Sequence, residues 1–151
     1  MRQSLSKNSG GGRSAGRAVV VAIALSLVLA VAAIIDQTGG HSLTDHTDAV
    51  YRSSGKQPSA ALLYGLVYTV AVIDAVLWLL VLGVARSHRL PASALAVTVI
   101  VITAGLALLL LASSEYDARI FPPLWGTLAI LPAVAGILAT VFLLRRAPEQ
   151  R

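Results

Sequence analysis

Asp74 is the residue of this 151-residue chain whose type and position most suggest chemistry. It is the one charged residue inside four long apolar runs, near the middle of residues 60–85. A charged side chain at the centre of a bilayer costs about 2.5–3.5 kcal/mol on insertion scales, so an intramembrane acid marks a candidate functional site. Such a carboxyl group can carry a proton or hold a small cation. The alternative is a neutral acid that hydrogen-bonds neighbouring helices, a contact worth about 0.6–2 kcal/mol.

Two hydroxyl side chains are expected at the depth of Asp74. If the midpoint of each run lies at the bilayer centre, Ser26 in the first run and Thr103 in the third are level with the acid. Pro132 in the fourth run cannot donate a backbone hydrogen bond, so it frees an acceptor at that depth. We therefore predict a polar layer at mid-membrane, with Asp74, Ser26 and Thr103 as its candidate site residues. No Lys, Arg or His lies within the runs to pair with the acid, which favours a structural role.

A second group of side chains that could do chemistry lies in the polar segment 37–59. It combines two histidines with two carboxylates: His41, Asp45, His46 and Asp48. Imidazole and carboxylate groups are ligands of divalent cations such as zinc. Glycines and serines in the same segment indicate a flexible loop, which is costly in entropy to order around an ion. A metal site and a solvated loop without a bound ion are therefore both open interpretations.

The elements that position these residues are expected to cross a membrane. Apolar residues make up 56% of the chain and charged residues 13%, with a mean hydropathy of +0.78. A soluble domain has about 45–50% apolar and about 25% charged residues. A membrane-spanning helix needs about 20 mostly apolar residues, and the runs of this kind are residues 18–35, 60–85, 92–112 and 124–144. They predict an all-α bundle of four transmembrane helices within residues 18–146.

The distribution of Lys and Arg predicts the orientation of the bundle. Nine of the 12 Lys and Arg residues lie on the side of the N-terminus and three on the opposite side. Because loops rich in Lys and Arg stay in the cytoplasm, both termini are expected there, with residues 37–59 as an outer loop. Residues 1–17 are expected to be a disordered basic tail and residues 147–151 a short second tail. We therefore expect a multi-pass protein of the cell membrane. The excess of Arg over Lys, with abundant Ala and Val, suggests the inner membrane of a bacterium.

The first apolar run also has an alternative interpretation as a signal peptide. Basic residues precede it, and Ala30-Val31-Ala32 has the form of a cleavage site. Cleavage after Ala32 would leave three spans, with the N-terminus outside. The run is 18 residues long, whereas the apolar core of a signal peptide has about 7–15 residues. Its length favours a retained helix.

Missing residues and motifs exclude several classes of function. The absence of cysteine excludes thiolate metal sites and Cys nucleophiles. All three histidines lie outside the runs, which excludes a haem held by two intramembrane histidines. No nucleotide-binding loop, nucleophile elbow or zinc-protease motif is present, so we expect neither an enzyme nor a cofactor. The basic residues lie beside apolar runs, so we expect no nucleic acid as a partner.

These observations favour a small polytopic membrane protein without enzymatic activity. Its role would be structural or accessory, and its partners would be the lipid bilayer and either another membrane protein or further copies of itself. The alternative is a small homo-oligomeric proton-coupled transporter or channel that uses Asp74. A sensor or enzyme built on residues 37–59 is a third interpretation.

Overall fold

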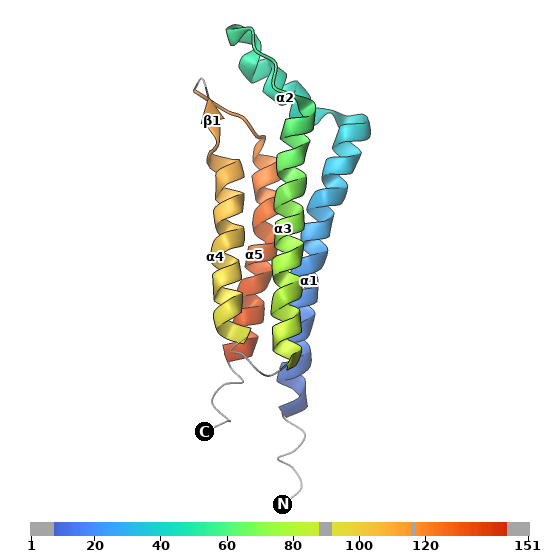
Figure 1. Cartoon of the computed structure of the whole chain (residues 1–151), viewed down its shortest axis with the longest axis vertical. Helices are drawn as coiled ribbons and strands as arrows, with labels where there is room; N and C mark the ends of the chain where they lie inside the picture. Colours follow the sequence, from blue (N-terminus) through green and yellow to red (C-terminus); the bar gives the residue numbers. More distant parts are fainter. Residues whose placement is uncertain (1–7, 88–91, 116, 145–151) are drawn as a thin grey trace, which may run out of the picture.

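The structure is a computed structural model that describes residues 8–87, 92–115 and 117–144 (Figure 1). Its α-helices are α1 (Asn8–Ile35), α2 (Ser42–Tyr51), α3 (Ala60–Ser87), α4 (Ala92–Ala112) and α5 (Pro123–Leu144). A π-helical turn η1 (Asp36–Gly40) joins α1 to α2, and a 3-10 turn η2 (Arg52–Ser54) follows α2. Between α4 and α5, the short strands β1 (Ser114–Glu115) and β2 (Ala118–Arg119) pair antiparallel. The described residues are therefore almost entirely helical.

Four of these helices, α1, α3, α4 and α5, are long and apolar enough to cross a membrane. This confirms the predicted all-helical architecture with four candidate spans. The helices α3, α4 and α5 begin and end within two residues of the predicted spans. Their bounds were predictable because prolines and charged residues flank each apolar run, and such residues commonly mark helix ends.

The helix α1 differs from its prediction at both ends. It begins at Asn8, so residues 8–17 are helical where a disordered tail was predicted. A helix that is already nucleated gains one hydrogen bond for each residue it adds, and Ala15 is buried against the bundle. At its other end, the chain continues as η1 to Gly40. The remainder of the predicted tail, residues 1–7, and the predicted tail at residues 147–151 lie outside the described residues.

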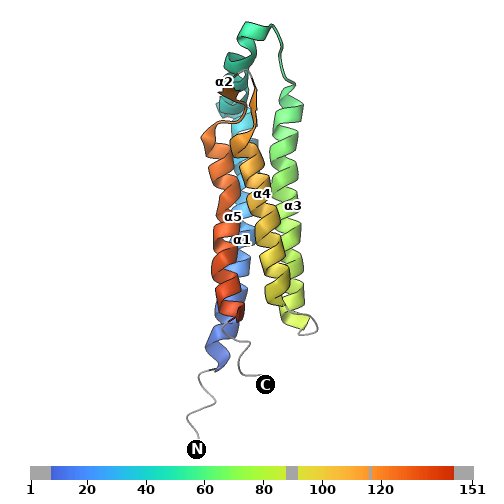
Figure 2. The same cartoon turned by 90° about the vertical axis from the view of Figure 1, so that its left-hand side faces the viewer.

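The four long helices run side by side as a bundle (Figures 1 and 2). The helix α1 packs against α3 and α5, and α4 packs mainly against α5 and also against α3. The order around the bundle is therefore α1, α3, α4, α5. The start of α1 and the end of α5 lie at one end, called here the terminal end. The helix α2 and the two strands lie at the opposite end, called here the cap end.

The interior of the bundle contains two clusters of buried apolar side chains. The cap-side cluster consists of Leu29, Ala33, Leu43, Leu63, Tyr64, Val67, Val70, Ala71, Ala107, Leu110, Phe121, Trp125 and Ala129. The terminal-side cluster consists of Val19, Ala22, Trp78, Val81, Ala96, Val99, Ala135 and Ala139. Along each long helix, a few residues separate the two clusters, and these residues form the middle of the bundle.

The exterior of the long helices is also apolar. In the most apolar stretch of each candidate span, at most 39% of the residues are buried inside the structure. Large side chains such as Val101, which is 66% exposed, therefore point away from the bundle. In water, an apolar surface of this extent would promote aggregation or serve as a binding site.

The segment 37–59, predicted as a flexible loop, is instead mostly helical. It contains most of η1, all of α2 and η2, and only His41 and residues 55–59 have no helical assignment. The prediction was wrong because it took the glycines and serines as evidence of flexibility. It did not consider that Asp36, the residue before the segment, supplies hydrogen bonds that organise it.

Candidate functional site

Asp74 lies in the middle of the bundle interior. Its side chain is 0% exposed, and along α3 it stands between Ala71 of the cap-side cluster and Trp78 of the terminal-side cluster. Neither carboxylate oxygen has a hydrogen-bond partner among the described residues. A buried polar group without a partner costs about 1–3 kcal/mol, and more when it is charged. The buried carboxyl group of Asp74 therefore lowers the stability of the fold, which makes Asp74 a candidate for a functional role.

Ser26 and Thr103 lie at the level predicted for them. Both are fully buried, and along their helices each stands between the terminal-side and cap-side clusters, as Asp74 does. The Ser26 hydroxyl donates to the carbonyl oxygen of Ala22 at 3.1 Å, and the Thr103 hydroxyl donates to that of Ile100 at 3.2 Å. The structure thus brings the three predicted residues to one level, but no hydrogen bond joins either hydroxyl to the acid.

The indole of Trp78 fills the bundle on the terminal side of Asp74. Trp78 follows Asp74 by one helical turn and is 0% exposed. It lies directly on the backbone of α5, because a Cβ atom at Gly136 would be 2.0 Å from its Cη2 atom. The same Cβ would be 3.1 Å from Cγ1 of Ile100 on α4. Trp78 therefore packs directly on α5, and it shares the terminal-side cluster with Ala96 and Val99 of α4.

The structure does not bring the four predicted metal ligands together. Within the described residues, no group of three or more His, Cys, Asp or Glu side chains could hold a metal ion. His46 instead forms a 2.9 Å hydrogen bond between its Nε2 atom and the carbonyl oxygen of Arg119. Because a carbonyl oxygen only accepts, Nε2 must carry the proton and is not free to bind a metal. His41 ends η1 with a positive φ of 53°, and Asp45 and Asp48 are exposed on α2.

The sequence prediction missed Asp36, which is the most connected polar side chain at the cap end. Its Oδ1 atom accepts hydrogen bonds from the backbone N–H of Ser42 at 2.9 Å and from the Ser42 hydroxyl at 2.6 Å. Its Oδ2 atom accepts from the N–H of Leu43 at 3.0 Å and from the hydroxyl of Tyr64 at 2.8 Å. Asp36 thus binds the first N–H groups of α2 and connects α2 to α3. The carboxylate also interacts favourably with the dipole at the start of α2.

One sequence signal could have indicated this arrangement. Ser42-Leu43-Thr44-Asp45 has the spacing of a helix start, which predicts a helix in the segment and N–H groups in need of a cap. Asp36 is the acid just upstream. Its contact with Tyr64, 28 residues further along the chain, had no signal in the sequence.

Further hydrogen bonds hold α2 to the strands. Besides the bond of His46, the Thr47 hydroxyl donates to the carbonyl oxygen of Leu43 at 2.7 Å and makes a longer, second contact of 3.4 Å with that of Ile120. The Tyr51 hydroxyl donates to the carboxylate of Glu115. The helix α2 is therefore bonded to the ends of α1 and α3 through Asp36 and to the α4–α5 connection through three side chains. It closes the cap end as an ordered structure.

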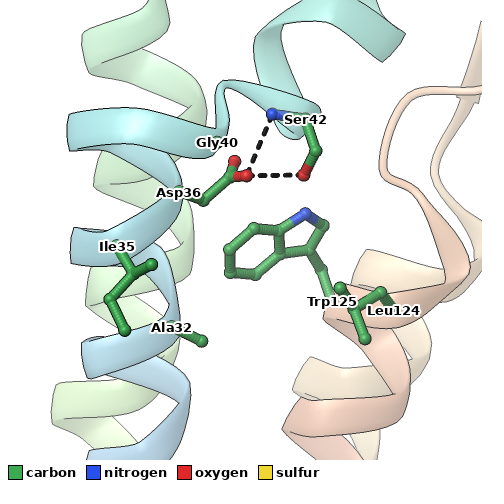
Figure 3. Close-up of a pocket in the computed structure, with 7 residues that line it drawn as sticks. All are labelled: Ala32, Ile35, Asp36, Gly40, Ser42, Leu124 and Trp125. Carbon is green, nitrogen blue, oxygen red and sulfur yellow. Dashed lines mark hydrogen bonds between the residues drawn. The ribbon is translucent and has the colours of Figure 1, made fainter.

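A pocket of about 250 Å³ lies beside Asp36, between the cap ends of α1 and α5. Its lining residues are Ala32, Ile35, Asp36, Gly40, Ser42, Leu124 and Trp125. Figure 3 shows the indole nitrogen of Trp125 turned toward the hydrogen-bonded pair of Asp36 and Ser42. This nitrogen is buried and has no hydrogen-bond partner among the described residues. The pocket therefore combines an apolar lining with an unused N–H donor.

Comparison with known proteins found no matching family model, no matching curated protein and no matching solved structure. The two buried acids, the pocket and the surface of the bundle are therefore the features of this chain that bear on its function.

Proposed function

We propose that this chain is a bacterial cell-membrane protein with four spans and both termini in the cytoplasm. The apolar exterior of α1, α3, α4 and α5 supports insertion, because lipid is the environment in which such a surface is stable. The excess of Lys and Arg on the side of the termini supports the orientation. In this arrangement the cap end faces outward and the terminal end faces the cytoplasm.

The packing of α1 supports its retention in the mature protein. Val19, Ala22, Leu29 and Ala33 are buried against neighbouring helices, and α1 contacts both α3 and α5. Cleavage after Ala32 would also separate the helix from Asp36, which follows it directly. We therefore propose that the first span is a permanent member of the bundle.

Labelling of single cysteines tests this topology, because the natural chain has no cysteine. Ser53 in η2 and Ser87 at the end of α3 are both exposed and lie at opposite ends of the bundle. In intact cells, S53C should react with a membrane-impermeant maleimide, whereas S87C should react only after permeabilisation. The labelled protein should also keep the full mass of 15.7 kDa. Equal labelling of the two variants, or a mature chain beginning at Ala33, would contradict the four-span arrangement.

The role that we propose is non-enzymatic and structural or accessory, beside a partner in the same membrane. The supporting observation concerns seven hydroxyl side chains of the long helices, each of which donates to a carbonyl oxygen of its own helix. They are Ser26, Thr69, Ser87, Thr98, Thr103, Thr127 and Thr140. Because their protons are bonded locally, these hydroxyls form no hydrogen-bonded chain from Asp74 to either end of the bundle. In this proposal Asp74 is an uncharged interior residue.

The alternative function is that of a homo-oligomeric proton-coupled transporter or channel. The observation in its favour is the absence of any described partner for either carboxylate oxygen of Asp74, which leaves both free to bind a proton or a cation. The two functions differ in what they require of this one side chain.

Replacing Asp74 with Asn separates the two functions. The accessory role predicts that D74N still co-purifies with the same membrane partner as the natural chain, and that neither protein gives pH-driven uptake in reconstituted vesicles. The transporter predicts uptake by the natural chain that D74N lowers to background, because Asn cannot carry the proton. D48N, which changes an exposed acid, is the matched control and should behave as the natural chain does. Uptake that is equal in the natural chain and D74N would contradict a transport role for Asp74.

A further inference from the structure

The pocket at the cap end has both apolar and polar residues in its walls. Ala32 and Ile35 of α1 and Leu124 of α5 form its apolar part. Ile35 is 64% exposed and Leu124 is 58% exposed, so the pocket reaches the surface of the bundle between these two side chains. In a membrane, this opening would lie near the boundary between hydrocarbon and headgroups. Lipid molecules would therefore contact the opening of the pocket.

The polar part of the pocket has little unused hydrogen-bonding capacity. The carboxylate of Asp36 already accepts four hydrogen bonds, which fills its ordinary acceptor positions. The hydroxyl proton of Ser42 is donated to Asp36, but its oxygen can still accept. The N–H of Trp125 is an unused donor, and this side chain is 1% exposed. The unused groups are thus one donor and one acceptor.

This pattern defines the chemistry of a ligand. A hydroxyl group can accept from the Trp125 N–H and donate to the Ser42 oxygen at the same time. An anionic headgroup would be repelled by the Asp36 carboxylate, and a cationic headgroup would find the carboxylate oxygens already occupied. A volume of about 250 Å³ is several times the space of one water molecule, which takes up about 30 Å³ in the liquid. The pocket therefore has room for a headgroup and the first part of a hydrocarbon chain.

We propose that this pocket binds an uncharged amphiphile through a hydroxyl headgroup that lies between Trp125 and Ser42. Its hydrocarbon tail contacts Ala32, Ile35 and Leu124 and leaves the pocket between the two exposed side chains. A diacylglycerol and a long-chain prenyl alcohol both have this chemistry. The inference rests on the proposed membrane location, which the cysteine labelling tests separately, so failure of one can be distinguished from failure of the other.

The fluorescence of Trp125 provides a direct test. The chain has two tryptophans, so W78F leaves Trp125 as the only one. The full-length variant is placed in phosphatidylcholine nanodiscs, and lipids with brominated chains, which quench tryptophan on contact, are added. Brominated diacylglycerol should quench saturably, at a mole fraction about five- to tenfold lower than brominated phosphatidylcholine needs. A32L, which fills the pocket from α1, should abolish the saturable part in the same W78F background.

Thermal stability gives a second measurement, which can be made on the natural chain without the W78F substitution. Diacylglycerol should raise the melting temperature of the natural chain and of W78F, but not that of W125F, which keeps an aromatic ring and loses the N–H. Trp78 is the matched control because its indole nitrogen is also buried without a described partner, yet it lies outside the pocket. A parallel series with a long-chain prenyl alcohol identifies the source of the hydroxyl, and phosphatidic acid should have no effect.

Three results would overturn the proposal. The first is equal quenching by the two brominated lipids, which would indicate ordinary contact with surrounding lipid. The second is saturable quenching that A32L leaves unchanged, and the third is stabilisation by diacylglycerol that persists in W125F.

Discussion

Replacing Asp36 with Ala is expected to destabilise the protein by about 3–5 kcal/mol, because it removes the acceptor of several charge-assisted hydrogen bonds at once. The N–H groups of Ser42 and Leu43 would lose their cap, and the hydroxyl of Tyr64, a residue only 1% exposed, would lose its partner. A buried donor left without an acceptor destabilises the fold by its full free energy of desolvation. The measurement is the free energy of unfolding of the full chain in mixed micelles, with protease sensitivity of residues 37–59 as a local measure.

Two further variants show whether the effect belongs to this arrangement. D45A removes an exposed acid from the first turn of α2, and should lower the free energy of unfolding by less than about 1 kcal/mol. Y64F removes one of the four donors to Asp36, so the cost of the double variant D36A/Y64F should be smaller than the sum of the two single costs. Equal stabilities of D36A and D45A would show that Asp36 does not organise the cap end.

The long helices could be predicted from the sequence because their signal is local. About 20 consecutive apolar residues predict a span whatever the remainder of the chain does, and α3, α4 and α5 agree closely with their predicted ranges. The level of Ser26, Asp74 and Thr103 was predictable for a related reason. Long helices of similar length that run side by side bring their midpoints to the same level of the bundle, so counting along each run is enough.

The cap end could not be predicted in this way because its order depends on contacts between distant residues. Polar composition alone predicts a loop for residues 37–59, whereas in the structure α2 is held by hydrogen bonds to Asp36 and to the α4–α5 connection. The same four proposed metal ligands illustrate the difficulty. Their residue types suit zinc, but three of them lie on α2, which turns His46 toward Arg119 and leaves Asp45 and Asp48 exposed.

The two buried acids show how the same residue type is used in opposite ways. Asp36 has four donors around its carboxylate, so it stabilises the fold in its charged form. Asp74 has no described donor, so the burial of its carboxyl group is not compensated by hydrogen bonds and lowers the stability of the fold. Stability therefore explains the presence of Asp36 but not that of Asp74, and this is why Asp74 is the residue to replace in a test of function.

Replacing Gly136 with Ala is expected to destabilise the bundle by about 1–3 kcal/mol, although Ala is the better helix former. The added Cβ would lie 2.0 Å from Cη2 and 2.3 Å from Cζ2 of Trp78, far inside van der Waals contact. The indole is rigid and fully buried, so it cannot yield without moving α3 away from α5. Because Trp78 belongs to the terminal-side cluster and follows Asp74 by one helical turn, this displacement should also let water reach Asp74 from that end. The measurements are the free energy of unfolding and the labelling of Cys in D74C, with and without G136A.

Matched glycine variants separate this contact from a general effect of replacing glycine. At Gly83 in α3 and Gly105 in α4, a Cβ would meet nothing within 4 Å, so alanine there should be neutral or stabilise by up to about 1 kcal/mol. W78L should relieve the clash, so that G136A costs much less in the W78L background than in the natural chain. If G136A were as well tolerated as the alanine variants of Gly83 and Gly105, then Trp78 would not lie on the backbone of α5.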